Sequence, residues 1–145
     1  MAPVSIISVL VWDSPTYTRN LLLNLETLPP GGRFHLRILD QGSGPETRDL
    51  LADFARGKAY VSVDRLERNI GYGPGHNRNF AAIWDRAPFD YFVTVNNDLL
   101  FGEPDWLRYM VQQMEANPDA AIGGPICYKG RDGIITPATR DDIAA

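Results

Sequence analysis

The sequence has little cysteine, no excess of positive charge and no long hydrophobic run. Its single cysteine, Cys127, excludes an internal disulfide bond and a cysteine-rich zinc site, so we expect a cytoplasmic protein in which Cys127 is a small buried side chain. The formal net charge of −4 argues against nucleic acid as a partner, because such binders normally carry a basic face. The apolar run VSIISVLVW lacks a basic leader and is too short to span a bilayer, which predicts a strand and no transmembrane segment.

What remains is the composition of an ordinary globular protein. The chain of 145 residues is 44% hydrophobic and 22% charged, and it shows no internal repeat, low-complexity segment or interdomain linker. We therefore expect one domain over residues 1–145, large enough to bury a substantial core.

Apolar segments of strand length alternate along the chain with segments of helical period. Strands are predicted over 4–11, 34–39, 60–66, 91–95 and 120–122. Helices are predicted to begin at Pro15 and Pro45 and to cover 74–84 and 103–114, with an irregular tail at the end. The first helix is expected to bury Tyr17, Leu21, Leu22, Leu25 and Leu28.

This alternation is typical of an α/β fold, a doubly wound and mostly parallel sheet with helices on its faces. Such sheets bind ligands outside the carboxyl ends of their strands. Four predicted strands are each followed there by carboxylate or amide side chains: Asp13, Asp40, Asn69, and the run Asn96, Asn97 and Asp98. The pattern predicts a polar crevice at one edge of the sheet.

Several motifs in this order carry a resemblance to a known family. The segments VSIISVLVWDSP, ILDQGSGPE, NIGYGPGHNRN and VNNDLLF resemble the nucleotide-sugar-binding part of family-2 glycosyltransferases, which have the Rossmann-like glycosyltransferase A fold. The resemblance covers nearly the whole chain. It implies a metal-dependent, inverting transfer of sugar from a nucleoside diphosphate sugar to a saccharide or other hydroxyl acceptor.

The resemblance also implies roles for the first three motifs. Asp40 matches the family's aspartate that accepts a hydrogen bond from a pyrimidine base, which suggests a uridine or thymidine diphosphate sugar; a turn-forming aspartate is the alternative. Asn69, Gly71 and Gly73 match the glycine-rich loop that lets the backbone approach the nucleotide. Asn77 matches the family's helix asparagine. His76 stands where many members have arginine, and either a structural or a ligand-binding histidine fits it.

The last motif, Asn96-Asn97-Asp98, resembles the family's D-x-D motif with its first acid replaced by Asn96. The resemblance makes Asp98 the ligand of a divalent cation, Mn²⁺ or Mg²⁺, whose remaining ligands come from the diphosphate and water. The amide of Asn96 would orient the sugar or a metal-bound water. An Asn-Asn-Asp turn that ends the strand is the alternative interpretation.

The aromatic residues and the tail complete the expectations. Trp12, beside Asp13, is the tryptophan placed to stack on a base or sugar, whereas core packing is expected for Trp84 and Trp106. Most of the acceptor half and the general base are not evident in the chain, and no motif singles out an acid in the tail. Two alternatives therefore stay open: a non-catalytic nucleotide-binding or assembly module, and a sugar-phosphate nucleotidyltransferase, although W-D-S-P departs from the loop that the latter needs. A peripheral position at the inner face of a membrane is suggested by the family.

Overall fold

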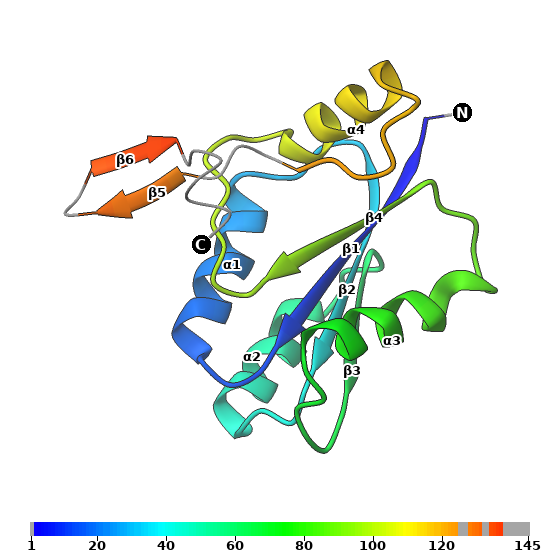
Figure 1. The fold of residues 1–145 in the computed structure, drawn as a ribbon. Coiled ribbons are helices and arrows are strands. Elements are labelled where there is room, and N and C mark those ends of the chain that lie inside the picture. Colours follow the sequence, from blue (N-terminus) through cyan, green and yellow to red (C-terminus); the bar gives the residue numbers. More distant parts are fainter. Residues whose placement is uncertain (1, 125–127, 132–133, 138–145) are drawn as a thin grey trace. The chain divides into compact units, whose positions relative to one another are not determined.

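The computed structural model describes residues 2–124, 128–131 and 134–137. Its elements follow one another as β1 (Val4–Val11), α1 (Pro15–Thr27), β2 (Arg33–Asp40), α2 (Pro45–Ala55), β3 (Val61–Arg65), α3 (Tyr72–Trp84), β4 (Tyr91–Asn96), α4 (Trp106–Ala116), β5 (Tyr128–Arg131) and β6 (Ile134–Pro137) (Figure 1). The chain forms two compact units, Met1–Tyr109 and Met110–Ala145.

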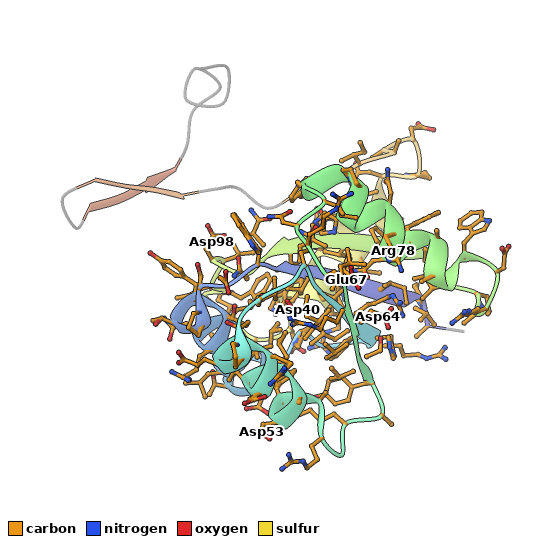
Figure 2. All side chains as sticks on the ribbon, turned by 90° about the horizontal axis from the view of Figure 1, so that it is seen from below. Asp40, Asp53, Asp64, Glu67, Arg78 and Asp98 are labelled. Carbon is orange, nitrogen blue, oxygen red and sulfur yellow. The ribbon has the colours of Figure 1, made fainter. Side chains whose placement is uncertain are left out.

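The first unit contains a parallel sheet with the strand order β3-β2-β1-β4. The central strand β1 is buried along almost its whole length, as its continuous apolar sequence predicts for a strand covered on both faces. Ile7 faces Leu25 of α1 and Phe54 of α2 across a cavity of about 240 Å³. The next residue, Ser8, points to the opposite face and bonds to His76 of α3. Figure 2 shows α1 and α2 on one side of the sheet and α3 on the other, so the predicted α/β architecture is confirmed.

The helix α1 shows how its sequence selects the buried face. Pro15 occupies its first position, and Thr18, Leu21, Leu22 and Leu25 are buried at the spacing of one helical stripe. The prediction was wrong for Tyr17, which lies off this stripe and is 58% exposed.

Three further predictions of local structure were wrong. The helix predicted over 103–114 begins only at Trp106, because Asp105 has a left-handed backbone (φ 61) and its N–H is held by the carbonyl of Pro29. Residues 120–122 form no strand, and Ile122 is 91% exposed. Instead of a wholly irregular tail, β5 and β6 pair antiparallel.

Of the three tryptophans, Trp106 is buried and stacks on Phe101, as core packing predicts. Trp84 is 61% exposed and stacks on Phe80, so the expected core position was wrong for it. The prediction for Cys127 lies outside the described residues. Among the helices of the described residues, none is long and apolar enough to cross a membrane.

Candidate functional site

The carboxyl ends of the four parallel strands define the candidate site. The chain runs outward from β1 through β2 to β3 and then returns to the other side of β1 as β4. The order of strands therefore reverses between β1 and β4, which is the position where open α/β sheets bind ligands. The 240 Å³ cavity lies elsewhere, because Pro29, Pro30 and Phe34 at the amino end of β2 contribute to its wall.

The loops after β1 and β2 are joined by two hydrogen bonds of Asp13. Its backbone N–H donates to the Ser43 hydroxyl (2.8 Å), and its carboxylate accepts from the backbone N–H of Gly44 (2.8 Å). Asp13 and Ser14 both have left-handed backbones, with φ of 50 and 53. This turn leaves the neighbouring Trp12 58% exposed at the edge of the sheet.

Asp40, the last residue of β2, is buried and has a partner on each carboxylate oxygen. One oxygen accepts from the backbone N–H of Ser43 (2.8 Å) and the other pairs with Arg65 at the end of β3. Arg65 also donates to the carbonyl of Ser43 (2.7 Å). Asp40 therefore fixes the loop that follows it, as the turn-forming alternative expected.

Gly42 allows this loop to lie against the segment after β3. Its φ is 86, and an added Cβ would be 2.7 Å from the carbonyl oxygen of Glu67. A side chain at this position would meet both backbone strain and a backbone clash.

The glycine-rich segment is tied to β2 and packed tightly on β1. Gln41 accepts a hydrogen bond from the backbone N–H of Ile70 (3.0 Å), and Asn69 accepts one from Gly71 (2.7 Å), which closes an Asx turn at the start of α3. Gly75 lies so close to Leu10 that an added Cβ would be 2.9 Å from the leucine side chain. By contrast, nothing lies within 4 Å of an added Cβ at Gly73.

The polar side chains of α3 divide between the solvent and the protein interior. Asn77 is exposed, whereas Asn79 is fully buried and donates to the hydroxyl of Ser8 (2.9 Å). His76 is buried too, with Nδ1 2.8 Å from the same hydroxyl, and burial lowers its pKa below the ordinary 6.5. The structural alternative for His76 therefore agrees with its position beneath α3. Sequence reasoning missed Asn79; the helical spacing of the buried residues Gly75, Asn79 and Ile83 is the signal that could have found it.

At the end of β4, one polar side chain bonds to α1 and the other two are exposed. The side-chain amide of Asn97 donates to the hydroxyl of Thr18 on α1 (3.1 Å), a buried partner that sequence reasoning missed. Asn96 and Asp98 are exposed, and Figure 2 shows Asp98 at the margin of the sheet near α1. Within the described part of the chain, no group of three or more histidine, cysteine or acidic residues could hold a metal by itself.

A comparison with protein families shows which family the chain belongs to. The model of glycosyl transferase family 2 matches residues 8–143, almost the whole chain. The chain belongs to glycosyl transferase family 2. The resemblance of its motifs to this family is thereby confirmed.

Solved structures share the fold of this glycosyltransferase domain. The mannosyltransferase PcManGT from Pyrobaculum calidifontis, solved with GDP-Man and Mn²⁺, aligns with a TM-score of 0.64 at 16% identity, over 78% of this chain and 32% of that one. S. aureus TarS 1–349 with UDP-GlcNAc aligns with a TM-score of 0.61 at 21% identity, over 80% and 32%. The chain thus spans about a third of the length of these two structures. A search of curated protein sequences gave no match.

The fold of the glycosyltransferase domain brings most of the predicted residues to one edge. Trp12, Asp13 and Asp40 belong to two loops that are bonded to each other, and the loop with Asn69 and Gly71 is bonded to the same unit through Gln41. The side chain of Asn97 turns toward α1, and Asn77 is exposed on α3. Donor binding by each of these residues stays a prediction.

Proposed function

We propose that this chain is the donor-binding part of a metal-dependent, inverting glycosyltransferase. It takes a nucleoside diphosphate sugar and passes the sugar to a saccharide or other hydroxyl acceptor. One observation supports the proposal above the others: the loops after β1, β2 and β3 are locked to one another by side-chain to backbone hydrogen bonds, while Trp12, Asn96 and Asp98 remain exposed at the same edge.

The base and ribose of the donor are placed at the β1–β2 side of this edge. Trp12 offers an exposed aromatic face on which a base or sugar ring can stack. The fixed turn of Asp13, Ser43 and Gly44 holds that ring in place because the backbone around it is cross-linked. The buried Asp40 sets the position of the neighbouring loop. A uridine or thymidine diphosphate sugar is the donor that the resemblance suggests.

The diphosphate is placed between the start of α3 and the end of β4. The first backbone N–H groups of α3 lack partners inside the helix, and they favour an anion near Gly71 and Gly73. Gly73 presents no side chain that would keep a ligand away from the backbone.

The residues present fit a divalent cation only together with the donor. Asp98 supplies one exposed hard oxygen and Asn96 an amide oxygen, which is too few for a metal site of the protein alone but suits Mn²⁺ or Mg²⁺ with phosphate and water as further ligands. Such a cation would neutralise the charge that develops on the departing diphosphate.

In the proposed reaction, an acceptor hydroxyl attacks the anomeric carbon as the bond from that carbon to the diphosphate oxygen breaks, which inverts the configuration. The hydroxyl proton passes to a general base. We assign none of the described residues to this role. The domain's own residues bind and orient the donor in this scheme. We expect the protein to be located in the cytoplasm, where nucleoside diphosphate sugars are available.

A thermal-shift panel tests this function. Uridine, thymidine, guanosine, cytidine and adenosine diphosphates are added singly, with Mn²⁺ and with a chelator. We expect at least one of them to raise the melting temperature in the presence of Mn²⁺. No shift with any diphosphate would contradict the proposal. Binding without release of nucleoside diphosphate from the matching sugar nucleotide, with acceptors supplied, would instead favour the non-catalytic module.

A further inference from the structure

The buried Asp40 and the partly exposed Arg65 differ sharply in what they can offer a ligand. The Asp40 side chain is 2% exposed, and both of its oxygens already have partners. The Arg65 side chain is 42% exposed at the carboxyl end of β3, next to the same loop. A ligand at this edge therefore meets the guanidinium before it meets the carboxylate.

Arg65 retains hydrogen-bond donors after its internal contacts are made. A guanidinium has five N–H groups. One terminal nitrogen pairs with Asp40 and the other donates to the carbonyl of Ser43. These two contacts leave about three N–H groups for a ligand, and they hold the guanidinium plane in one orientation.

The surroundings keep this arrangement rigid. Asp40 and Arg65 are directly paired across β2 and β3, so their backbones are fixed by the sheet. Gly42 presses the loop against the segment at Glu67, and Ser43 is bonded in turn to Asp13, the neighbour of Trp12. A donor held this firmly is suited to reading the position of an acceptor atom.

We propose that Arg65 is a specificity-determining residue that donates a hydrogen bond to a ring carbonyl oxygen of the donor's base, and that Asp40 positions it. The inference rests on the proposed function. Uracil and thymine present a carbonyl at the 4-position and guanine at the 6-position, whereas cytosine and adenine carry an amino group there. Arg65 thus selects bases with a carbonyl at this position, because the amino group of cytosine or adenine would place its own N–H groups against the N–H groups of Arg65.

The test compares uridine and cytidine diphosphates, which share sugar, diphosphate and metal requirement. Calorimetry in Mn²⁺ gives both dissociation constants for the wild type and for Arg65→Lys. Lysine keeps the charge beside Asp40 but lacks the fork that bonds Asp40, Ser43 and a base together. We expect the wild type to prefer uridine diphosphate about tenfold or more, and Arg65→Lys to bring this ratio close to one. Arg56→Lys is the matched control, since Arg56 is an exposed arginine paired with Asp53 on α2, and its ratio should equal that of the wild type.

The outcomes separate this inference from the proposed function. An unchanged ratio in Arg65→Lys, with both affinities lowered equally, would show a structural role only and overturn the inference while the function stands. A wild type that binds no nucleoside diphosphate would overturn both. If thermal unfolding shows that Arg65→Lys does not fold, the paired variant Asp40→Asn with Arg65→Gln replaces it, since two amides can still bond to each other without net charge. The same loss of ratio is expected there.

Discussion

At the scale of single residues, His76 places a titratable ring in the interior beneath α3. Its Nδ1 contacts Ser8, and burial lowers its pKa from the ordinary 6.5. Between the lowered pKa and 6.5 the unfolded chain binds more protons than the folded chain, so stability is fully present above pH 6.5 and falls as the pH falls through this window. We expect the melting temperature of the wild type to fall more steeply between pH 7.5 and 5 than that of His76→Gln.

His35 provides the comparison for that experiment. Its pKa is also lowered, by burial and then by the charge of Arg37, so it contributes to the pH dependence with the same sign. His35→Gln should remove the contribution of His35 to the pH dependence of the melting temperature and leave the contribution of His76. A slope for His76→Gln that equals the wild-type slope would contradict the assignment.

The hydrogen bond between Asn97 and Thr18 is the residue-scale contact that holds the loop of Asp98. Thr18→Val keeps the shape of a fully buried side chain and removes the hydroxyl. We expect a loss of about 1 kcal/mol in the free energy of unfolding, measured by urea denaturation. Asn97→Ala should cost less in the Thr18→Val background than in the wild type, because the shared bond is already absent. Strictly additive losses would show that the two side chains are not coupled.

At the scale of elements, glycines determine how closely the loops and α3 approach the sheet. Gly42→Ala forces a side chain into a left-handed backbone and against the carbonyl of Glu67, so we expect a loss of about 2–3 kcal/mol in unfolding free energy. The measurement is chemical denaturation with circular dichroism.

The matched variant for Gly42→Ala is Gly73→Ala, in the first turn of α3, where an added methyl group meets nothing within 4 Å. It should be neutral or stabilising by about 0.5 kcal/mol. If Gly73→Ala destabilised the protein as much as Gly42→Ala, the close contact of Gly42 with the Glu67 backbone would not explain the effect of Gly42→Ala. Gly73 is also a predicted donor-binding position. Gly73→Ala should therefore weaken nucleotide binding although it does not lower the free energy of unfolding.

The bounds of most elements were predictable from local sequence, whereas the late start of α4 has a tertiary cause. The continuous apolar run of β1, the alternating apolar residues of β2 and the prolines that begin α1 and α2 make these four elements predictable. The start of α4 depends on the contact of Asp105 with Pro29, far away in sequence, which no local pattern reveals.

The location of the candidate site at the carboxyl edge of the sheet was predictable, but most contacts between its residues were not. Polar residues that follow strands were expected at the carboxyl end of the sheet, and Asp13, Asp40 and Asn69 lie there. The partner Arg65 was not predicted, because an arginine at a strand end has many ordinary roles. Only the parallel pairing of β2 with β3 brings Arg65 beside Asp40.

At the scale of the whole molecule, the first unit holds every residue proposed to bind the donor, from Trp12 to Asp98. We expect this unit to bind a nucleoside diphosphate through a cation held at Asp98. Such binding requires metal and nucleotide to bind together, because the described residues alone offer no complete metal site. It also requires Asp98 to matter for binding and not for folding, since its side chain is exposed.

The most direct measurement is a calorimetric titration of the chain with uridine diphosphate, with and without Mn²⁺, for the wild type, Asp98→Ala and Asp53→Ala. Asp53 is an exposed acid on α2 and serves as the control (Figure 2). We expect Mn²⁺-dependent binding that Asp98→Ala weakens at least about tenfold and Asp53→Ala leaves unchanged. Binding that is indifferent to Mn²⁺ and to Asp98→Ala, in a chain shown to be folded, would contradict this expectation.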